Sequence, residues 1–226
     1  MRKAISLYEQ NKLLVRAMDW PQLSNGINGL QYDCTTWANE FCMLLNGNLN
    51  SLSSTLIIPG VGVSTYKNIG FLIDSDTSEC FHIAKSDSGS NGNVQNGDFH
   101  ANKADFSTLS ELADYIIENN STGINEVNIN TSIDSVVGLF INECSNQEKL
   151  LEMIYLAKRC IKSITGIDFP IFLYNVLEGK ISEIELSYED EQQIINSLKT
   201  SQILYWPDEY NNPVVEDVSI VDHNVK

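Results

Sequence analysis

Three short apolar runs between residues 55 and 85 constrain the fold of this chain more than any other feature. The runs at 55–58, 68–73 and 79–85 are strand-like in length and composition and are separated by polar segments. The residues between the last two runs, Asp-Ser-Asp-Thr-Ser at 74–78, favour a turn. The pattern predicts a small antiparallel sheet in the first half of the chain.

The character of the sequence changes after residue 105. Ser107 is a predicted helix cap, because Ser110 and Glu111 follow it closely and an amphipathic run comes next. Most of this half is predicted to be helical, with helices at 107–119, 132–143, 146–164, 168–178 and 188–200 and a late strand at 203–206. We therefore expect an α+β protein with a core at 1–105 and a helical extension at 106–226, packed on the core or continuous with it.

The composition is that of a globular protein with an acidic surface. Hydrophobic residues make up 42% of the 226 residues and charged residues 19%, which allows a sizeable core. The formal net charge is −16, and the 14 Lys and Arg residues are scattered. Such a surface repels phosphate backbones, so we expect no nucleic-acid partner, whereas a cationic partner is compatible with it.

Cysteine usage and the first 20 residues indicate synthesis in the cytoplasm. Five widely spaced cysteines are an odd number, and no Cys-x-x-Cys pair suggests a zinc site. Polar residues at 9–12 interrupt the N-terminal region, so it does not resemble a signal peptide. No run approaches the roughly 20 apolar residues that span a bilayer. We expect no stable membrane insertion, and export by a specialised secretion system if the protein acts elsewhere.

Cys34 is the predicted nucleophile. It follows an Asn- and Gly-rich segment at 21–29 and stands where a helix is expected to begin, near Asp33. A helix N-terminus stabilises a thiolate through its dipole and its N–H groups, which also suit an oxyanion. The other four cysteines fall within helical or strand patterns and are predicted to fill the core. A buried structural thiol is the alternative for Cys34 as well.

Two segments resemble the NlpC-type papain-like peptidases and the related CHAP amidases. YDCTTWANEFCMLLNG, at 32–47, is similar to the family's nucleophile segment, and NIGFLIDSDTSECFHIAKSDSG, at 68–89, resembles its paired strands. The resemblance covers about residues 25 to 90. It implies a papain-like fold, with a nucleophile helix on a small antiparallel sheet, and cleavage of peptide bonds in peptidoglycan. Several relatives are toxins delivered into competing bacteria, which implies an antibacterial effector with an immunity or delivery protein as partner.

The sequence departs from the family pattern at the catalytic base. The family's histidine opens the first paired strand, where this chain has Asn68, and asparagine does not accept a proton from a thiol at neutral pH. His82 matches the position that orients the base in the family. Three explanations stay open. His82 is the base, since neighbouring strands present side chains about 5 Å apart; or the strands are shifted, and His100 orients His82; or the base is lost and the domain only binds.

The resulting hypothesis is a cysteine peptidase or amidase. Cys34 would attack a carbonyl carbon as the thiolate, and His82 would deprotonate the thiol and later protonate the leaving amine. Backbone N–H groups, with Gln31, would hold the oxyanion. No metal or organic cofactor is expected. The alternatives are a papain-like binding module without catalysis and a Cys-dependent transglutaminase or deamidase that acts on a protein.

Overall fold

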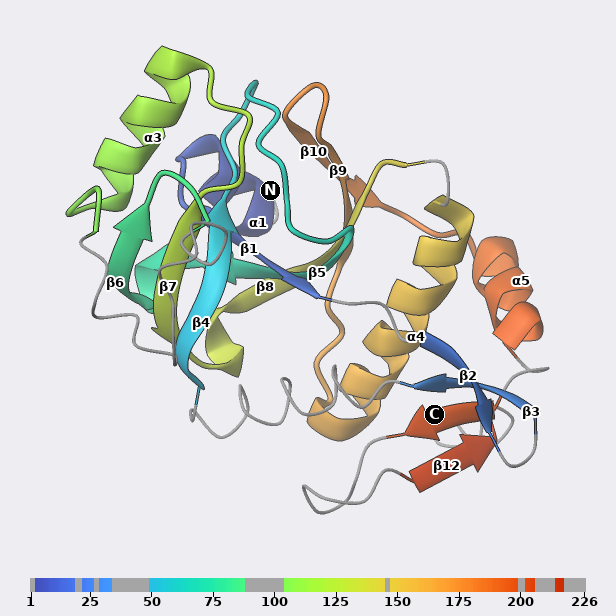
Figure 1. The fold of residues 1–226 in the computed structure, drawn as a ribbon. Coiled ribbons are helices and arrows are strands. Elements are labelled where there is room, and N and C mark those ends of the chain that lie inside the picture. The colour runs from blue at the N-terminus through green and yellow to red at the C-terminus, as the bar shows by residue number, and fades with distance from the viewer. Residues whose placement is uncertain are drawn as a thin grey trace.

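A computed structural model of the chain describes residues 3–18, 22–26, 29–33, 49–87, 104–144, 147–198, 202–205 and 214–217. These residues form an α+β fold in which an eight-stranded mixed sheet is the largest element (Figure 1). A four-stranded sheet and several helices complete the described part of the chain.

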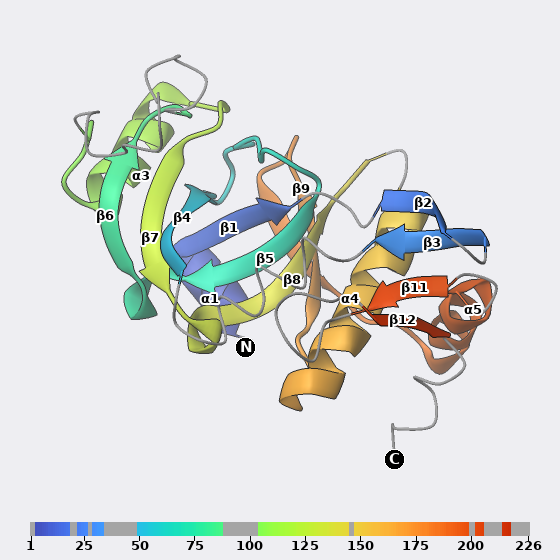
Figure 2. The ribbon, with the colours of Figure 1, turned by 60° about the horizontal axis from the view of Figure 1, so that its bottom comes forward.

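The large sheet has the strand order β10-β9-β8-β5-β1-β4-β7-β6. In chain order its strands are β1 (Leu13–Met18), β4 (Leu49–Leu56), β5 (Ile69–Asp74), β6 (Glu79–Ala84), β7 (Glu126–Thr131), β8 (Val136–Asn142), β9 (Ile171–Asn175) and β10 (Lys180–Ile184). Neighbours are antiparallel except β8 and β9, which are parallel. Figure 2 shows the twist of the sheet, with β6 and β7 running at a steep angle to β5 and β8. Strands from both sides of residue 105 therefore belong to one sheet.

The small sheet joins early and late parts of the chain. Its strands are β2 (Gln22–Gly26), β3 (Gly29–Asp33), β11 (Gln202–Tyr205) and β12 (Val214–Asp217), in the order β12-β11-β3-β2. β11 pairs with β3 in parallel, and the other two pairings are antiparallel.

The described helices are α1 (Lys3–Glu9), α3 (Leu109–Asn119), α4 (Gln147–Thr165) and α5 (Tyr188–Leu198), with short 3-10 turns η1 (Ser75–Thr77) and η3 (Ile133–Ser135). The cap of α3 is Thr108 rather than the expected Ser107. The Thr108 hydroxyl accepts from the Glu111 N–H at 3.2 Å, and the Glu111 carboxylate accepts from the Thr108 N–H. This is a capping box, one residue later than the sequence predicted.

One hydrophobic core joins the large sheet to its helices. β5 is buried along its whole length, because α1 and α4 both contact it. Phe71, Phe140, Phe172 and Tyr174 are the largest of the fully buried side chains. In Figures 1 and 2, α4 lies between the large and small sheets. None of the helices in the described ranges is long and apolar enough to cross a membrane.

The prediction of a papain-like core with a mostly helical second half is wrong. The range 132–143 contains β8, and 168–178 contains β9. Both strands are short apolar runs buried at most positions. Such runs lack the polar alternation of a half-exposed strand, and periodicity alone cannot separate them from buried helix. Helices at 107–119, 146–164 and 188–200 are confirmed by α3, α4 and α5.

The expected pairing of the two strands around the 74–78 turn is also wrong. The turn exists, as η1, but β1, β4 and β7 lie between β5 and β6 in the sheet. The sequence pattern predicts no strand at 13–18 or at 126–131, where β1 and β7 lie. β1 instead pairs with β5, and β7 pairs with β6. These long-range pairings exclude the small papain-like sheet that the resemblance implied.

Candidate functional site

The predicted site residues are not all within the described part of the chain. Cys34 and His100 lie outside the described residues, and so does the predicted helix that begins near Asp33. Gln31 belongs to β3, which pairs with β11. Asn68 and His82 are described, so their surroundings are known.

Asn68 links β5 to β8. Its side-chain Oδ1 accepts a hydrogen bond from Asn142 Nδ2 at 3.1 Å, and its backbone carbonyl accepts from the Asn142 N–H at 2.8 Å. Asn142 Nδ2 also donates to Thr65 Oγ1 at 2.6 Å. These contacts tie the segment that precedes β5 to the end of β8. Asn68 therefore has a structural role, several strands away from β6.

His82 lies in β6, at one edge of the large sheet, and only 6% of it is exposed. It stands opposite Asn128 of β7, which in turn stands opposite Ser53 of β4. Directly opposed residues in antiparallel strands point to the same face, with Cβ atoms about 5 Å apart. The three residues therefore form a polar row across three neighbouring strands.

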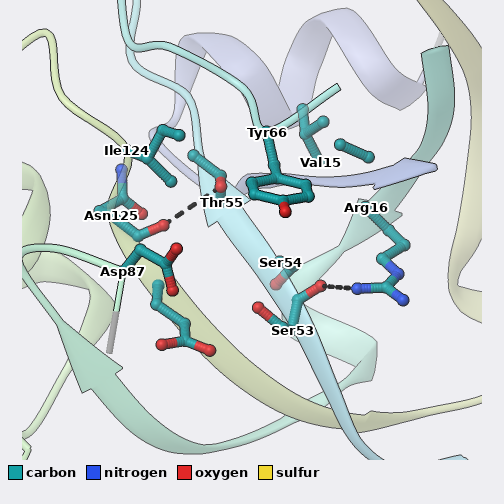
Figure 3. A pocket seen from close by; sticks show the side chains of 11 residues that line it. Val15, Arg16, Ser53, Ser54, Thr55, Tyr66, Asp87, Ile124 and Asn125 are labelled. Carbon is teal, nitrogen blue, oxygen red and sulfur yellow. Dashed lines mark hydrogen bonds between the residues drawn. The ribbon is translucent and has the colours of Figure 1, made fainter. Parts of the chain in front are cut away.

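A cleft of about 560 Å³ lies beside this row (Figure 3). Strands β1 and β4, the segment that leads into β7, and two residues from other segments line it. The lining residues are Val15, Arg16, Ala17, Ser53, Ser54, Thr55, Tyr66, Asp87, Ile124, Asn125 and Glu126. The volume falls within the range of small-molecule sites, about 300–1,000 Å³.

The cleft carries opposite charges on its two sides. Arg16 lies on one side, where its Nη1 donates to the Ser53 carbonyl oxygen at 2.9 Å (Figure 3). Asp87 lies on the other side, and Glu126, which is 5% exposed, also lines the cleft. All three residues make further interactions within the protein. Hydroxyl groups of Ser53, Thr55 and Tyr66 also line the cleft.

Asn125 fixes one wall of the cleft. Its side-chain Oδ1 accepts from the Leu56 N–H at 2.8 Å, and its Nδ2 donates to the Leu56 carbonyl at 2.9 Å. Thr55 Oγ1 donates to the Asn125 carbonyl at 3.1 Å, and Ser54 Oγ donates to the Val127 carbonyl at 2.8 Å. The Asn125 side chain thus continues the pairing of β4 and β7 beyond the last regular backbone pair. These bonds hold β4 and the start of β7 in register along the cleft.

The described cysteines do not form a reactive centre. Burial raises the pKa of the Cys80 thiol to about 11, so this thiol is neutral at physiological pH. Cys80 and Cys144 are both free and partly buried. In the described ranges, no group of three or more His, Cys, Asp or Glu side chains is arranged to hold a metal ion.

Sequence reasoning missed the residues that line the cleft, although two signals were present. Arg16 is the only charged residue in the apolar run of β1. Glu126, Asn128 and Asn130 alternate with Val127 and Ile129, which is the pattern of a half-polar strand. Asp87 carried no signal, because the sequence places it at the start of a polar, turn-rich segment.

The comparisons with known proteins place the chain in no family. No family model matches the sequence, and no curated protein matches it. The resemblance to NlpC-type peptidases therefore stays a prediction about chemistry, without support from the fold.

Proposed function

We propose that the chain is a binding protein whose cleft takes a short peptide or a similar ligand with both an ammonium and a carboxylate group. The observation that carries the proposal is the charge pattern of the cleft. Asp87 supplies negative charge on one side, Arg16 supplies positive charge on the opposite side, and Glu126 also lines the cleft. A zwitterionic ligand that spans the cleft would satisfy both sides at once.

The chemistry of the side chains suits this ligand. A guanidinium carries five N–H donors in a fixed fork, and its geometry matches a carboxylate well. Carboxylates accept the N–H groups of an ammonium. The formal net charge of −16 favours the approach of the ammonium end. Hydroxyls of Ser53, Thr55 and Tyr66 lie on the cleft wall between these charges, where they suit polar groups in the middle of a ligand.

Calorimetric titration with triglycine and two blocked derivatives tests the proposal. N-acetyltriglycine lacks the ammonium, and triglycinamide lacks the carboxylate. We expect each block to weaken binding by about 10- to 100-fold, because a hydrogen bond to a charged group contributes about 1.5–3 kcal/mol. Asp87→Asn should weaken the binding of triglycine. Its affinities for triglycine and N-acetyltriglycine should then be nearly equal. Arg16→Gln should lose the discrimination against triglycinamide.

Asp114→Asn is the matched control, since Asp114 is an exposed carboxylate on α3, away from the cleft lining. It should leave all three affinities unchanged. Equal binding of triglycine and its blocked derivatives to the wild-type protein, or no binding of any of them, would contradict the proposal.

Amide hydrolysis through Cys34 is the second candidate function. The observation that favours it is the row of His82, Asn128 and Ser53, which connects a buried imidazole to the wall of the cleft. Triads of a nucleophile, a histidine and an orienting residue, of which Cys–His–Asn is one, perform acyl transfer on unrelated folds, so the chemistry of such a triad does not depend on one fold. A substrate bound in the cleft would then be cleaved at an amide bond, with Cys34 as nucleophile and His82 as base.

Mass spectrometry of peptidoglycan peptides after incubation with the protein tests this candidate. Hydrolysis gives two new ends, whereas acyl transfer to an amine gives a crosslink. Cys34→Ala and His82→Ala should both abolish the reaction, and Cys80→Ala should leave it unchanged. Full activity in Cys34→Ala would rule out the cysteine mechanism.

A further inference from the structure

Asn128 is buried on β7, beside the edge strand β6 of the large sheet, without hydrogen-bond partners for its side chain among the described residues. None of it is exposed, and neither its Nδ2 nor its Oδ1 has a partner among the described residues. Asn125, three residues earlier and also buried, uses both side-chain groups to bond Leu56. Nearly all buried polar groups in proteins are hydrogen-bonded, and an exception calls for a reason. The contrast within one strand region makes Asn128 such an exception.

The position of Asn128 connects it to the cleft. Alternate residues of a strand point to the same face, so Asn128 shares a face of β7 with Glu126, which lines the cleft. Across the strands, Asn128 stands opposite Ser53, which also lines the cleft. Asn128 is thus next to the cleft wall in two directions.

We propose that Asn128 recognises an amide group of the ligand, which makes the cleft specific for peptides among zwitterions. The inference rests on the proposed function of the cleft. A carboxamide presents one N–H donor face and one carbonyl acceptor, and a peptide bond presents the complementary carbonyl and N–H. The pairing would satisfy both unpartnered groups of Asn128 together.

Recognition of this kind discriminates strongly. A site built to hydrogen-bond a ligand group rejects an analogue that lacks it, because the buried polar groups of the site are then left unpaired. Since Asn128 is fully buried, the side chains that cover it must move when the ligand binds. Changes of side-chain rotamer are common at binding sites whose backbone stays in place.

The test compares triglycine with 8-aminooctanoic acid, a zwitterion of the same chain length that has no amide. We expect the wild-type protein to prefer triglycine by at least about tenfold. Asn128→Leu should reduce this preference below about twofold, with little change in the affinity for 8-aminooctanoic acid. Asn128→Val is a second variant, with a side chain that suits a strand. Both variants remove an unsatisfied buried group, so they should fold.

Asn130→Leu is the matched control. Asn130 lies two residues further along β7, outside the cleft lining, where its Nδ2 donates to Glu79 Oε2 at 2.9 Å. This variant should keep the preference for triglycine.

An unchanged preference for triglycine in Asn128→Leu would overturn the inference about Asn128 but would not contradict ligand binding in the cleft. Failure of both probes to bind the wild-type protein would overturn the binding function and this inference together.

Discussion

At the scale of single residues, the surroundings of a cysteine determine the pKa of its thiol. Cys80 lies on β6 and packs against the core. Burial disfavours the charged thiolate there and raises the pKa of the thiol to about 11. A cysteine at a helix N-terminus experiences the opposite effect, because the helix dipole stabilises the thiolate.

Alkylation across pH, mapped by mass spectrometry, separates the two cysteines. Cys80 should react slowly below about pH 9, with a rate that rises toward about pH 11, because only the thiolate reacts. If Cys34 is an activated nucleophile, its apparent pKa lies below the free value of about 8.5. A normal or inert Cys34 would remove the second candidate function. Rapid alkylation of Cys80 at neutral pH would contradict its burial.

At the scale of elements, the cleft depends on how closely strands approach one another. β1 packs against β5 at Gly70, where an added Cβ would lie 1.9 Å from the Arg16 carbonyl oxygen. Arg16 also lines the cleft, so the same contact positions one of its charged residues.

Gly70→Ala should therefore destabilise the protein by about 1–3 kcal/mol and weaken triglycine binding, since the β1 backbone has to shift. Gly123→Ala is the control, because nothing lies within 4 Å of the added Cβ there. It should change the free energy of unfolding by less than about 1 kcal/mol. Urea denaturation of both variants checks the expectation, and equal stabilities would contradict the close approach.

The side chain of Asn125 adds two hydrogen bonds between β4 and the segment that leads into β7. Asn125→Ala leaves the N–H and carbonyl of the fully buried Leu56 without these partners. We expect a loss of roughly 2–6 kcal/mol in the free energy of unfolding, at about 1–3 kcal/mol for each of the two unsatisfied groups. Asn119→Ala, which removes an exposed bond to the Tyr115 carbonyl, should cost less than about 1 kcal/mol. Similar losses in the two variants would show that the Leu56 contacts contribute little.

The sequence predicted helices better than it predicted the sheet, for a physical reason. α3, α4 and α5 are amphipathic, so the apolar periodicity of each helix can be recognised within its own residues. β8 and β9 are buried at most positions and lose the alternation that marks a strand. The candidate site depends on the pairing of β4 with β1 and with β7, and such long-range register cannot be read from local periodicity.

At the scale of the whole molecule, buried tyrosine and cysteine side chains make the free energy of unfolding depend on pH in the alkaline range. Burial raises the pKa of Tyr8 to about 12, against the lowering effect of a backbone hydrogen bond. Burial raises the pKa of Tyr174 as well, and its hydroxyl donates to the Val63 carbonyl at 2.9 Å. With Cys80, these groups hold their protons more tightly in the folded state than in the unfolded state.

The free energy of unfolding should therefore be insensitive to these groups below about pH 9 and fall as the pH rises toward about pH 12. The unfolded chain releases the protons first, which favours unfolding at alkaline pH. Denaturant titrations between about pH 7 and pH 11 measure the effect, and Tyr8→Phe and Tyr174→Phe should each reduce the slope. A stability that stays constant up to pH 11 would contradict the burial of these groups.

Chemical-shift mapping by NMR tests the binding cleft most directly. Triglycine is added to ¹⁵N-labelled protein, and the backbone amide signals are followed. We expect the largest shifts to cluster at residues 15–17, 53–55 and 124–126 and at Tyr66 and Asp87, all of which line one cleft. Asp114→Asn should leave this pattern intact, and Arg16→Gln should diminish it. Shifts that are absent, or that centre on strands away from β1 and β4, would contradict peptide binding in this cleft.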